Sequence, residues 1–171
     1  IGGGKQGMVA VSDVTMYDPL SKTWTKKADM PSSRSMLSAC VFDHKIYCFG
    51  GTNENYTNTF YPNAEVYDPV EDKWKIINDM PVGRWSPGVC ALNNLIYVTG
   101  GHYGVAALAR VDILNPDTNE WTLGEPMQQV RQGHEICVVD GKIYILGGSC
   151  SENGMPKFLS SMEVFGVVSD Q

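Results

Sequence analysis

The chain has 171 residues, of which 43% are hydrophobic, so it is long enough to bury a core. Its 19 acidic and 13 basic residues leave a net charge of −6 at pH 7, which argues against a nucleic-acid or anionic-membrane partner. The sequence contains no apolar run of membrane-spanning length and no visible signal peptide, so we predict no membrane partner.

Three hairpins are predicted one after another along the chain. In each, two short runs of β-branched and aromatic residues are split by a two-residue step rich in Asp, Asn or Gly, a strong local hairpin signal. The paired runs are 37–42 with 45–49, 88–92 with 95–99, and 136–139 with 142–146. Each hairpin ends in a glycine pair, and another pair opens the chain. The pairs are Gly2-Gly3, Gly50-Gly51, Gly100-Gly101 and Gly147-Gly148.

Two further strands are expected after each of the first three glycine pairs, and one after the last. A large side chain marks the third strand of each unit, and a tryptophan marks the fourth strand of the first three units. These residues are Tyr17, Tyr67, Leu114 and Phe165, and then Trp24, Trp74 and Trp121. Asx-Pro turns join the two strands, because Asx caps a turn and Pro presets φ. No segment has a sustained helical period, so the predicted unit is a four-stranded antiparallel meander.

The unit recurs with a period of ~50 residues, which indicates a repeat array of β-propeller blades. Paired glycines, then tyrosine, then tryptophan at a fixed offset resemble the Kelch repeat over nearly the whole chain. We therefore predict an all-β fold: a Kelch-type β-propeller, as a partial ring of two complete four-stranded blades plus two incomplete ones. The repeated glycines and aromatic residues are predicted to be scaffold and not binding residues.

The repeat divides the chain into four parts. Residues 1–31 supply the outer strands of blade one, 32–81 form blade two, 82–127 form blade three, and 128–171 form an incomplete blade four. The sequence does not begin with Met and opens at the end of a second strand, so we expect it to belong to a longer polypeptide. The open blade faces are expected to expose apolar surface.

The cysteines indicate a reducing compartment. Cys40, Cys90 and Cys137 share one repeat position and are predicted to be small buried residues, whereas Cys48 lies in a second strand. Cys150 falls in a loop and is the one candidate for reactivity. An odd total without CxxC or metal-type histidine spacing favours free thiols, a cytoplasmic location, and no metal or cofactor.

Catalytic patterns are weak in this sequence. His44, His102 and His134 are scattered and belong to no nucleophile or metal motif, so we predict no catalytic residues and no enzyme activity. His134 either faces the central channel of the propeller or simply ends a strand. No glycine-rich phosphate loop opens a helix, because the glycine pairs end strands.

Candidate partner-binding residues lie in the loops that follow the glycine pairs, because variable loops on a rigid scaffold commonly carry binding. These loops, 52–63, 102–108 and 149–159, contribute Tyr56, Tyr61, His102 and Tyr103. In an up-and-down blade they share a face with the segments between blades. Those segments place Arg34, Arg84 and Arg131 at one repeat position, where they either bind an acidic peptide bidentately or tie one blade to the next.

In the Kelch family, residues just after this arginine often reach the channel mouth and touch ligand. The resemblance carries that role to Met36, Ser86 and Gly133, with Trp85 and His134 beside them. The set is mixed and not basic. It therefore does not clearly preserve the family's binding of acidic peptides, and a neutral or partly apolar peptide is equally compatible.

The resemblance implies a non-enzymatic protein–protein interaction module that binds a protein or peptide on the loop face. The implied role is the substrate-recognition domain of a BTB-Kelch adaptor for a cullin ubiquitin ligase, which would reach the cullin through a BTB domain outside this chain. The alternative is an actin-binding or cytoskeletal Kelch protein. A more distant alternative is a propeller enzyme, such as a copper radical oxidase or a sialic-acid mutarotase.

Overall fold

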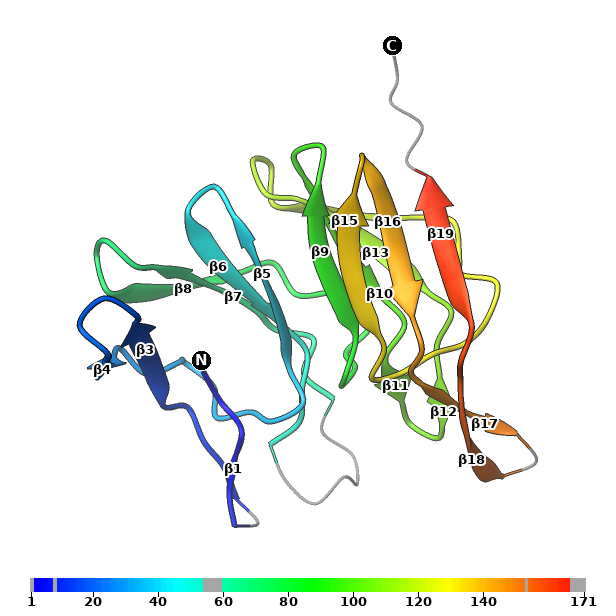
Figure 1. Ribbon diagram of the computed structural model, residues 1–171, viewed down its shortest axis with the longest axis horizontal. Helices are drawn as coiled ribbons and strands as arrows, with labels where there is room; N and C mark the ends of the chain where they lie inside the picture. Colours follow the sequence, from blue (N-terminus) through cyan, green and yellow to red (C-terminus); the bar gives the residue numbers. More distant parts are fainter. Residues whose placement is uncertain (1, 8, 54–59, 153, 167–171) are drawn as a thin grey trace.

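The computed structural model describes residues 2–7, 9–53, 60–152 and 154–166, which form antiparallel strands and turns and no helix. Four sheets lie one after another around a common centre, in the order of the sequence (Figure 1). The innermost strands of neighbouring sheets pack against each other. The chain is therefore a partial β-propeller, and the predicted all-β propeller fold is confirmed.

Blade one consists of two strands, β3 (Val14–Asp18) and β4 (Thr23–Lys27). Gly2 bridges to Val14 as the end of a preceding strand, as the sequence predicts. Tyr17 and Trp24 face each other across the pair, with their ring centroids 5.0 Å apart. Because only one sheet lies beside them, both aromatic side chains are about half exposed.

Blade two is a complete meander. Its strands, in spatial order, are β5 (Ser38–Phe42), β6 (Lys45–Phe49), β7 (Ala64–Asp68) and β8 (Lys73–Ile77). The β5–β6 turn has φ of 45° at Asp43 and 59° at His44, the two left-handed residues that a tight hairpin turn requires.

Blade three repeats this arrangement. Its four strands are β9 (Gly88–Leu92), β10 (Leu95–Thr99), β13 (Val111–Asn115) and β14 (Glu120–Leu123). Blade four contains three strands in the described residues: β15 (Glu135–Val139), β16 (Lys142–Leu146) and β19 (Met162–Gly166).

The loops that follow the glycine pairs contain short hairpins, which the sequence did not predict. These hairpins are β1 (Lys5–Gln6) with β2 (Val9–Ala10), β11 (His102–Tyr103) with β12 (Ala106–Ala107), and β17 (Ser149–Glu152) with β18 (Met155–Phe158). They lie along one edge of the molecule, at the bottom of Figure 1. The hairpins of blades three and four contact each other through β12 and β17. Strands of two to four residues are too short to give a periodic sequence signal.

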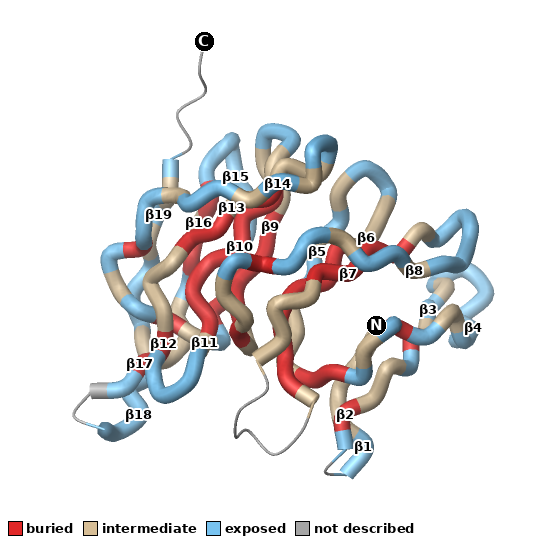
Figure 2. Tube along the Cα trace, turned by 180° about the vertical axis from the view of Figure 1, so that it is seen from behind, coloured by how far each residue is buried: buried red, intermediate tan, exposed pale blue. Residues whose placement is uncertain are grey.

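The core lies between neighbouring blades (Figure 2). Phe49, Ile96 and Leu114 are fully buried between blades two and three, and Tyr97 with Ile143 fills the next interface. The repeated tryptophans add hydrogen bonds between blades. Trp74 Nε1 donates to the Ala28 carbonyl at 2.8 Å, and Trp121 Nε1 donates to the Asn78 carbonyl at 3.0 Å.

The glycine pairs are sites of close backbone approach. Gly50 has φ of +68°, and a Cβ at this position would lie 2.3 Å from the Arg84 carbonyl oxygen of the next interblade segment. A larger residue would therefore force neighbouring blades apart.

The two outermost sheets expose apolar side chains, as expected from the incomplete blades. Met16 and Trp24 are exposed on blade one, and Met162 and Val164 are exposed on blade four. The shared cysteine position shows the same effect: Cys90 is buried between blades, Cys40 is half-buried, and Cys137 is exposed. The prediction that all three are buried is therefore wrong for Cys137. None of the described residues belongs to a helix that is long and apolar enough to cross a bilayer.

Candidate functional site

Three residues at one repeat position lie together just before the innermost strands, and we call the surface they form the channel mouth. Met36, Ser86 and Gly133 all have left-handed backbones, with φ of 57°, 48° and 58°. The Ser86 N–H donates to the Met36 carbonyl at 2.8 Å, and the Gly133 N–H donates to the Ser86 carbonyl at 3.0 Å. Main-chain hydrogen bonds thus link three successive interblade segments and bring these three residues together.

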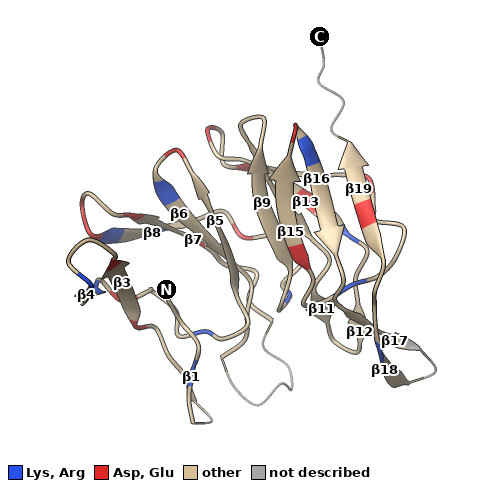
Figure 3. Ribbon diagram, in the orientation of Figure 1, with Lys and Arg blue, Asp and Glu red and all other residues tan. Residues whose placement is uncertain are grey.

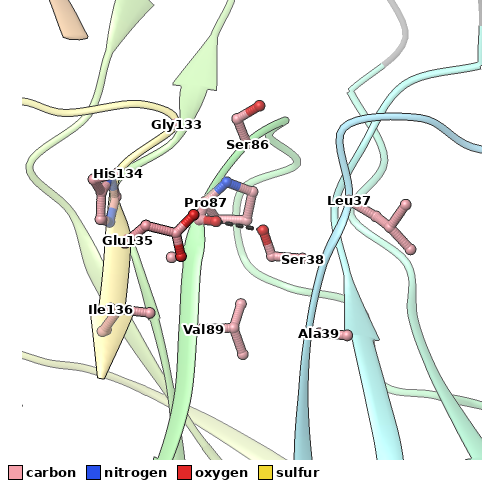
Figure 4. A pocket seen from close by; sticks show the side chains of 11 residues that line it. Leu37, Ser38, Ala39, Ser86, Pro87, Val89, Gly133, His134, Glu135 and Ile136 are labelled. Carbon is pink, nitrogen blue, oxygen red and sulfur yellow. Dashed lines mark hydrogen bonds between the residues drawn. The ribbon is translucent and has the colours of Figure 1, made fainter. Parts of the chain in front are cut away.

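A cavity of about 300 Å³ opens beside this mouth (Figure 4). It is lined by residues 37–39, 86–89 and 133–136, which are the starts of the innermost strands β5, β9 and β15 and the residues just before them. The Ser38 hydroxyl donates to the Pro87 carbonyl at 2.5 Å. Its walls therefore come from three blades and contain both polar and apolar groups.

His134 lines this cavity, but its side chain is buried. Its Nε2 lies 2.9 Å from Thr99 Oγ1 in blade three, and a Cβ at Gly88 would approach that nitrogen to 2.5 Å. Burial, aided by the charge of Arg131, lowers the pKa of His134 to about 4, so the ring is neutral at pH 7. His134 therefore ends the segment before β15 and also joins blade four to blade three.

A second hollow adjoins the first, and both include Ser86 and Gly133 in their walls. Its remaining walls include Trp85, Gln132 and Phe158. Trp85 Nε1 and Gln132 Oε1 are buried and have no hydrogen-bond partner within the described ranges. Phe158 is 85% exposed at the end of hairpin β17–β18. The second hollow thus combines exposed aromatic surface with polar atoms whose hydrogen-bonding capacity is unused.

Trp85 and His102 are held as a stacked pair. Their ring centroids are 4.5 Å apart, and their backbones exchange two hydrogen bonds of 2.9 and 3.2 Å. Burial lowers the pKa of His102, which favours the uncharged ring. The pair therefore presents a rigid, neutral aromatic surface beside the channel mouth.

The predicted tyrosines occupy different environments. Tyr103 is about half exposed on β11 and lies 5.3 Å from the Phe60 ring. The ring of Tyr61 lies 4.9 Å from the Arg34 guanidinium carbon, so it covers a buried cation. Tyr56 lies outside the described residues.

The three repeated arginines are buried and cannot meet a partner at the surface. Arg34 donates to the carbonyls of Gly50 and Asn63 at 3.0 and 3.1 Å and to Glu65 Oε1 at 2.6 Å. Arg84 and Arg131 repeat this arrangement with other acids. Their acidic partners are Asp112 and Glu163.

The arginine backbones complete the connection between blades. The carbonyls of Arg34, Arg84 and Arg131 accept hydrogen bonds from the N–H groups of the preceding blade's glycine region. The side chain and backbone of each arginine therefore bind adjacent blades together. Of the two roles considered from the sequence, the geometry supports the tie between blades. It corrects the assignment of these arginines to partner binding.

The lining residues that were not predicted include Gln132, Glu135 and Phe158. Gln132 could have been found, because it holds the same repeat position as Trp85, directly after the arginine. Phe158 lies in a hairpin that had no sequence signal. Glu135 is the first residue of β15 and resembles any polar residue at the start of a strand.

Two chemical features of the described residues bear on catalysis. They contain no group of three or more His, Cys, Asp and Glu side chains close enough to hold a metal ion. Cys150, the predicted reactive thiol, is buried in β17, so its assignment to an open loop is corrected.

Comparisons with known proteins identify Kelch repeats in this chain. Residues 1–171 match the family model of the KLHDC2/KLHL20/DRC7 Kelch-repeats domain. Over 53 residues, the chain is 38% identical to the Kelch repeat and BTB domain-containing protein 2 of Ectromelia virus (strain Moscow), which covers 31% of this chain and 10% of that protein.

A solved structure of YjhT superposes with a TM-score of 0.79 at 13% identity and covers 95% of this chain. The chain spans about half of YjhT, with 51% of that chain covered, and about a tenth of the viral protein. Because the family model covers every residue, the chain belongs to the KLHDC2/KLHL20/DRC7 Kelch-repeat family.

Proposed function

We propose that this chain recognises a peptide segment of a partner protein at the channel mouth. The observation that carries the proposal is the pair of hollows that share Ser86 and Gly133. Together they form a concave surface with an aromatic wall, and ligand sites commonly combine such walls with a few polar groups. Membership of a Kelch-repeat family supports a protein-interaction module.

The protonation of three buried cysteines favours binding over catalysis at their positions. Burial raises the pKa of Cys40, Cys48 and Cys90 to about 12, so these thiols stay protonated at pH 7. The His134 ring lies beside the Thr99 hydroxyl, and its low pKa reflects burial. A non-enzymatic role therefore forms part of the proposal.

We further propose that the module selects substrates for a BTB-Kelch adaptor of a cullin ubiquitin ligase in the cytoplasm. The family match and the BTB domain named in the viral relative support this role. The cullin would bind outside this chain, so its recruitment and substrate recognition are separable functions.

Affinity purification of the full-length protein from cells tests both parts. We expect cullin to co-purify with wild type and with Trp85→Ala, and a set of substrate proteins to be lost only with Trp85→Ala. Leu20→Ala, in an exposed turn of blade one, is the control and should retain both. Absence of cullin would reject the adaptor role, and pelleting with actin filaments would then favour the cytoskeletal alternative. Substrate recovery that is unchanged by Trp85→Ala would reject the proposed surface.

A further inference from the structure

We infer that the channel-mouth cavity accepts a positively charged side chain, a lysine or an arginine of the partner peptide, and that Glu135 is its counter-ion. The inference rests on the proposed peptide-binding function of this surface and adds the chemical class of the residue that enters it. It concerns the cavity lined by Ser86, Gly133 and Glu135, beside the aromatic hollow at Trp85.

The first argument is the charge of the cavity wall. Strands β5 and β9 contain no charged residue, and Glu135 is the one acid or base in β15 (Figure 3). Glu135 is exposed, and its side chain points toward Pro87 and Ser38 of the neighbouring blades (Figure 4). Among the described residues it makes no ion pair. The wall therefore has a net negative charge with no local compensation.

The neighbouring basic groups do not neutralise Glu135. Burial holds the pKa of His134 at about 4, so this ring is uncharged at pH 7. Arg131 is buried and paired with Glu163 at 2.9 Å, and it also donates to the carbonyls of Gly147 and Ser161. A cation from outside is thus the available partner for Glu135.

The second argument is the direction of the hydrogen bonds at the mouth. The N–H groups of Ser86 and Gly133 already donate to neighbouring carbonyls, and Pro87 has no N–H. The Ser38 hydroxyl donates to the Pro87 carbonyl. Carbonyl oxygens retain a second lone pair after one hydrogen bond, so the mouth still offers acceptors after these donors are engaged.

This pattern discriminates between ligand charges. An acidic side chain needs donors, and the arginines at the same segments are buried in ion pairs of their own. Lysine and arginine carry only donors, which match the Glu135 carboxylate and the carbonyl oxygens. The net charge of −6 adds a long-range attraction for a basic peptide.

The size of the cavity favours a single side chain. A volume of about 300 Å³ is at the lower end of the range for sites that hold whole small molecules. The adjoining hollow would hold a neighbouring residue of the same peptide against Trp85 and Phe158. The inferred ligand is therefore a short segment with a basic residue next to an apolar or aromatic one.

Selection from a phage-displayed library of random peptides tests the inference with the full-length protein. We expect wild type to enrich peptides with Lys or Arg at one position. Glu135→Gln should bind a selected peptide about tenfold more weakly, the effect of one lost charge-assisted contact. Glu120→Gln, an exposed acid on β14, is the matched control and should bind as wild type does. Both variants change exposed residues, and thermal melting checks that they fold.

A double-mutant cycle locates the contact. Replacing the basic residue of the selected peptide by Gln should weaken binding to wild type about tenfold and should not weaken binding to Glu135→Gln further. Full affinity of Glu135→Gln, or enrichment of acidic or uncharged peptides that still need Trp85, would overturn the inference and leave the proposed function standing. Failure to enrich any peptide would overturn both.

Discussion

Removing Arg34 should destabilise the propeller more than removing Arg84, although the two hold the same repeat position. Arg34 and Glu65 are both fully buried, with Arg34 Nη2 and Glu65 Oε1 2.6 Å apart. Within the described residues Glu65 has no other cation, and its Oε2 makes no hydrogen bond. Arg34→Ala therefore leaves a buried carboxylate unpaired, a change that typically costs about 3–5 kcal/mol. The carbonyls of Gly50 and Asn63 also lose their donor.

Blade three has a second cation that blade two lacks. Asp112 accepts hydrogen bonds from Arg84 and also from Arg110, whose Nε and Nη2 lie 2.6–2.9 Å from the carboxylate oxygens. Arg110 is 31% exposed and reaches Asp112 through its own Nε and Nη2 donors. After Arg84→Ala, Asp112 remains paired. We expect a loss of about 1.5–3 kcal/mol, as for hydrogen bonds to a charged group.

Urea unfolding of the full-length variants, followed by tryptophan fluorescence, measures this difference. The free energy of unfolding should be lower for Arg34→Ala than for Arg84→Ala, by about 2 kcal/mol at the midpoints of these ranges. Arg110→Ala alone should have a small effect, whereas Arg84→Ala with Arg110→Ala should lose more than the two single changes together. Equal losses for Arg34→Ala and Arg84→Ala would refute the claim that Arg110 compensates.

Three further outcomes can be measured on the same protein. The pKa of His134 falls from 6.5 in the unfolded state to about 4 in the folded state, so the unfolded state binds more protons between these pH values. The free energy of unfolding should therefore drop by up to about 3 kcal/mol as the pH falls from 6.5 to 4. His134→Gln should flatten this slope in urea midpoints, and an unchanged slope would assign it to other groups. Trp74→Ala should cost about 3 kcal/mol of stability, because it removes the contact with Tyr67 and the hydrogen bond to the Ala28 carbonyl. Tyr103 is half exposed, so Tyr103→Ala should change stability by less than about 0.5 kcal/mol. Equal shifts in melting temperature would contradict the separation of scaffold from binding surface. His44→Gly should stabilise by about 0.5 kcal/mol, because φ there is 59° and the equivalent turn of blade four is already Asp140-Gly141; a lower melting temperature would count against it.

The strands were predictable because their signals are local. Run 88–92 coincides with β9 (Gly88–Leu92), and run 45–49 coincides with β6 (Lys45–Phe49). Asp43 and His44, the two residues between these paired runs, adopt the left-handed backbone of the predicted hairpin turn. Hairpin β17–β18 was missed, because its four-residue strands are too short to give a periodic signal, and in the structure it contacts β12 of the neighbouring blade.

Burial at repeated positions was less predictable. Cys90 and Cys137 are equivalent in the repeat, yet one is buried between two blades and the other is exposed on the outermost sheet. Sequence periodicity reports which face of a strand a residue occupies. It does not report whether another sheet covers that face.

The candidate site could be located from the sequence, but its chemistry could not be assigned. The arginine register pointed to Ser86, Trp85 and Gly133, and the structure brings these residues together at two adjoining hollows. From the sequence, the arginines could either bind acidic ligands or join blades, and their repetition in register favoured the join between blades. Their carboxylate partners lie about thirty residues away in the chain, as for Arg34 with Glu65, so a local pattern could not reveal the pairing.

The sequence by itself determined the repeat, the strand order and the turns, because alternation, paired glycines and Asx-Pro steps act over a few residues. Only the tertiary structure decided which polar groups are already engaged. The N–H groups of Ser86 and Gly133 bond to carbonyls one repeat earlier, at Met36 and Ser86, and the arginines are neutralised inside the blades. Besides the Ser86 hydroxyl, the channel mouth is thereby left with Glu135 and carbonyl acceptors. This balance arises from contacts between residues that only the ring brings together.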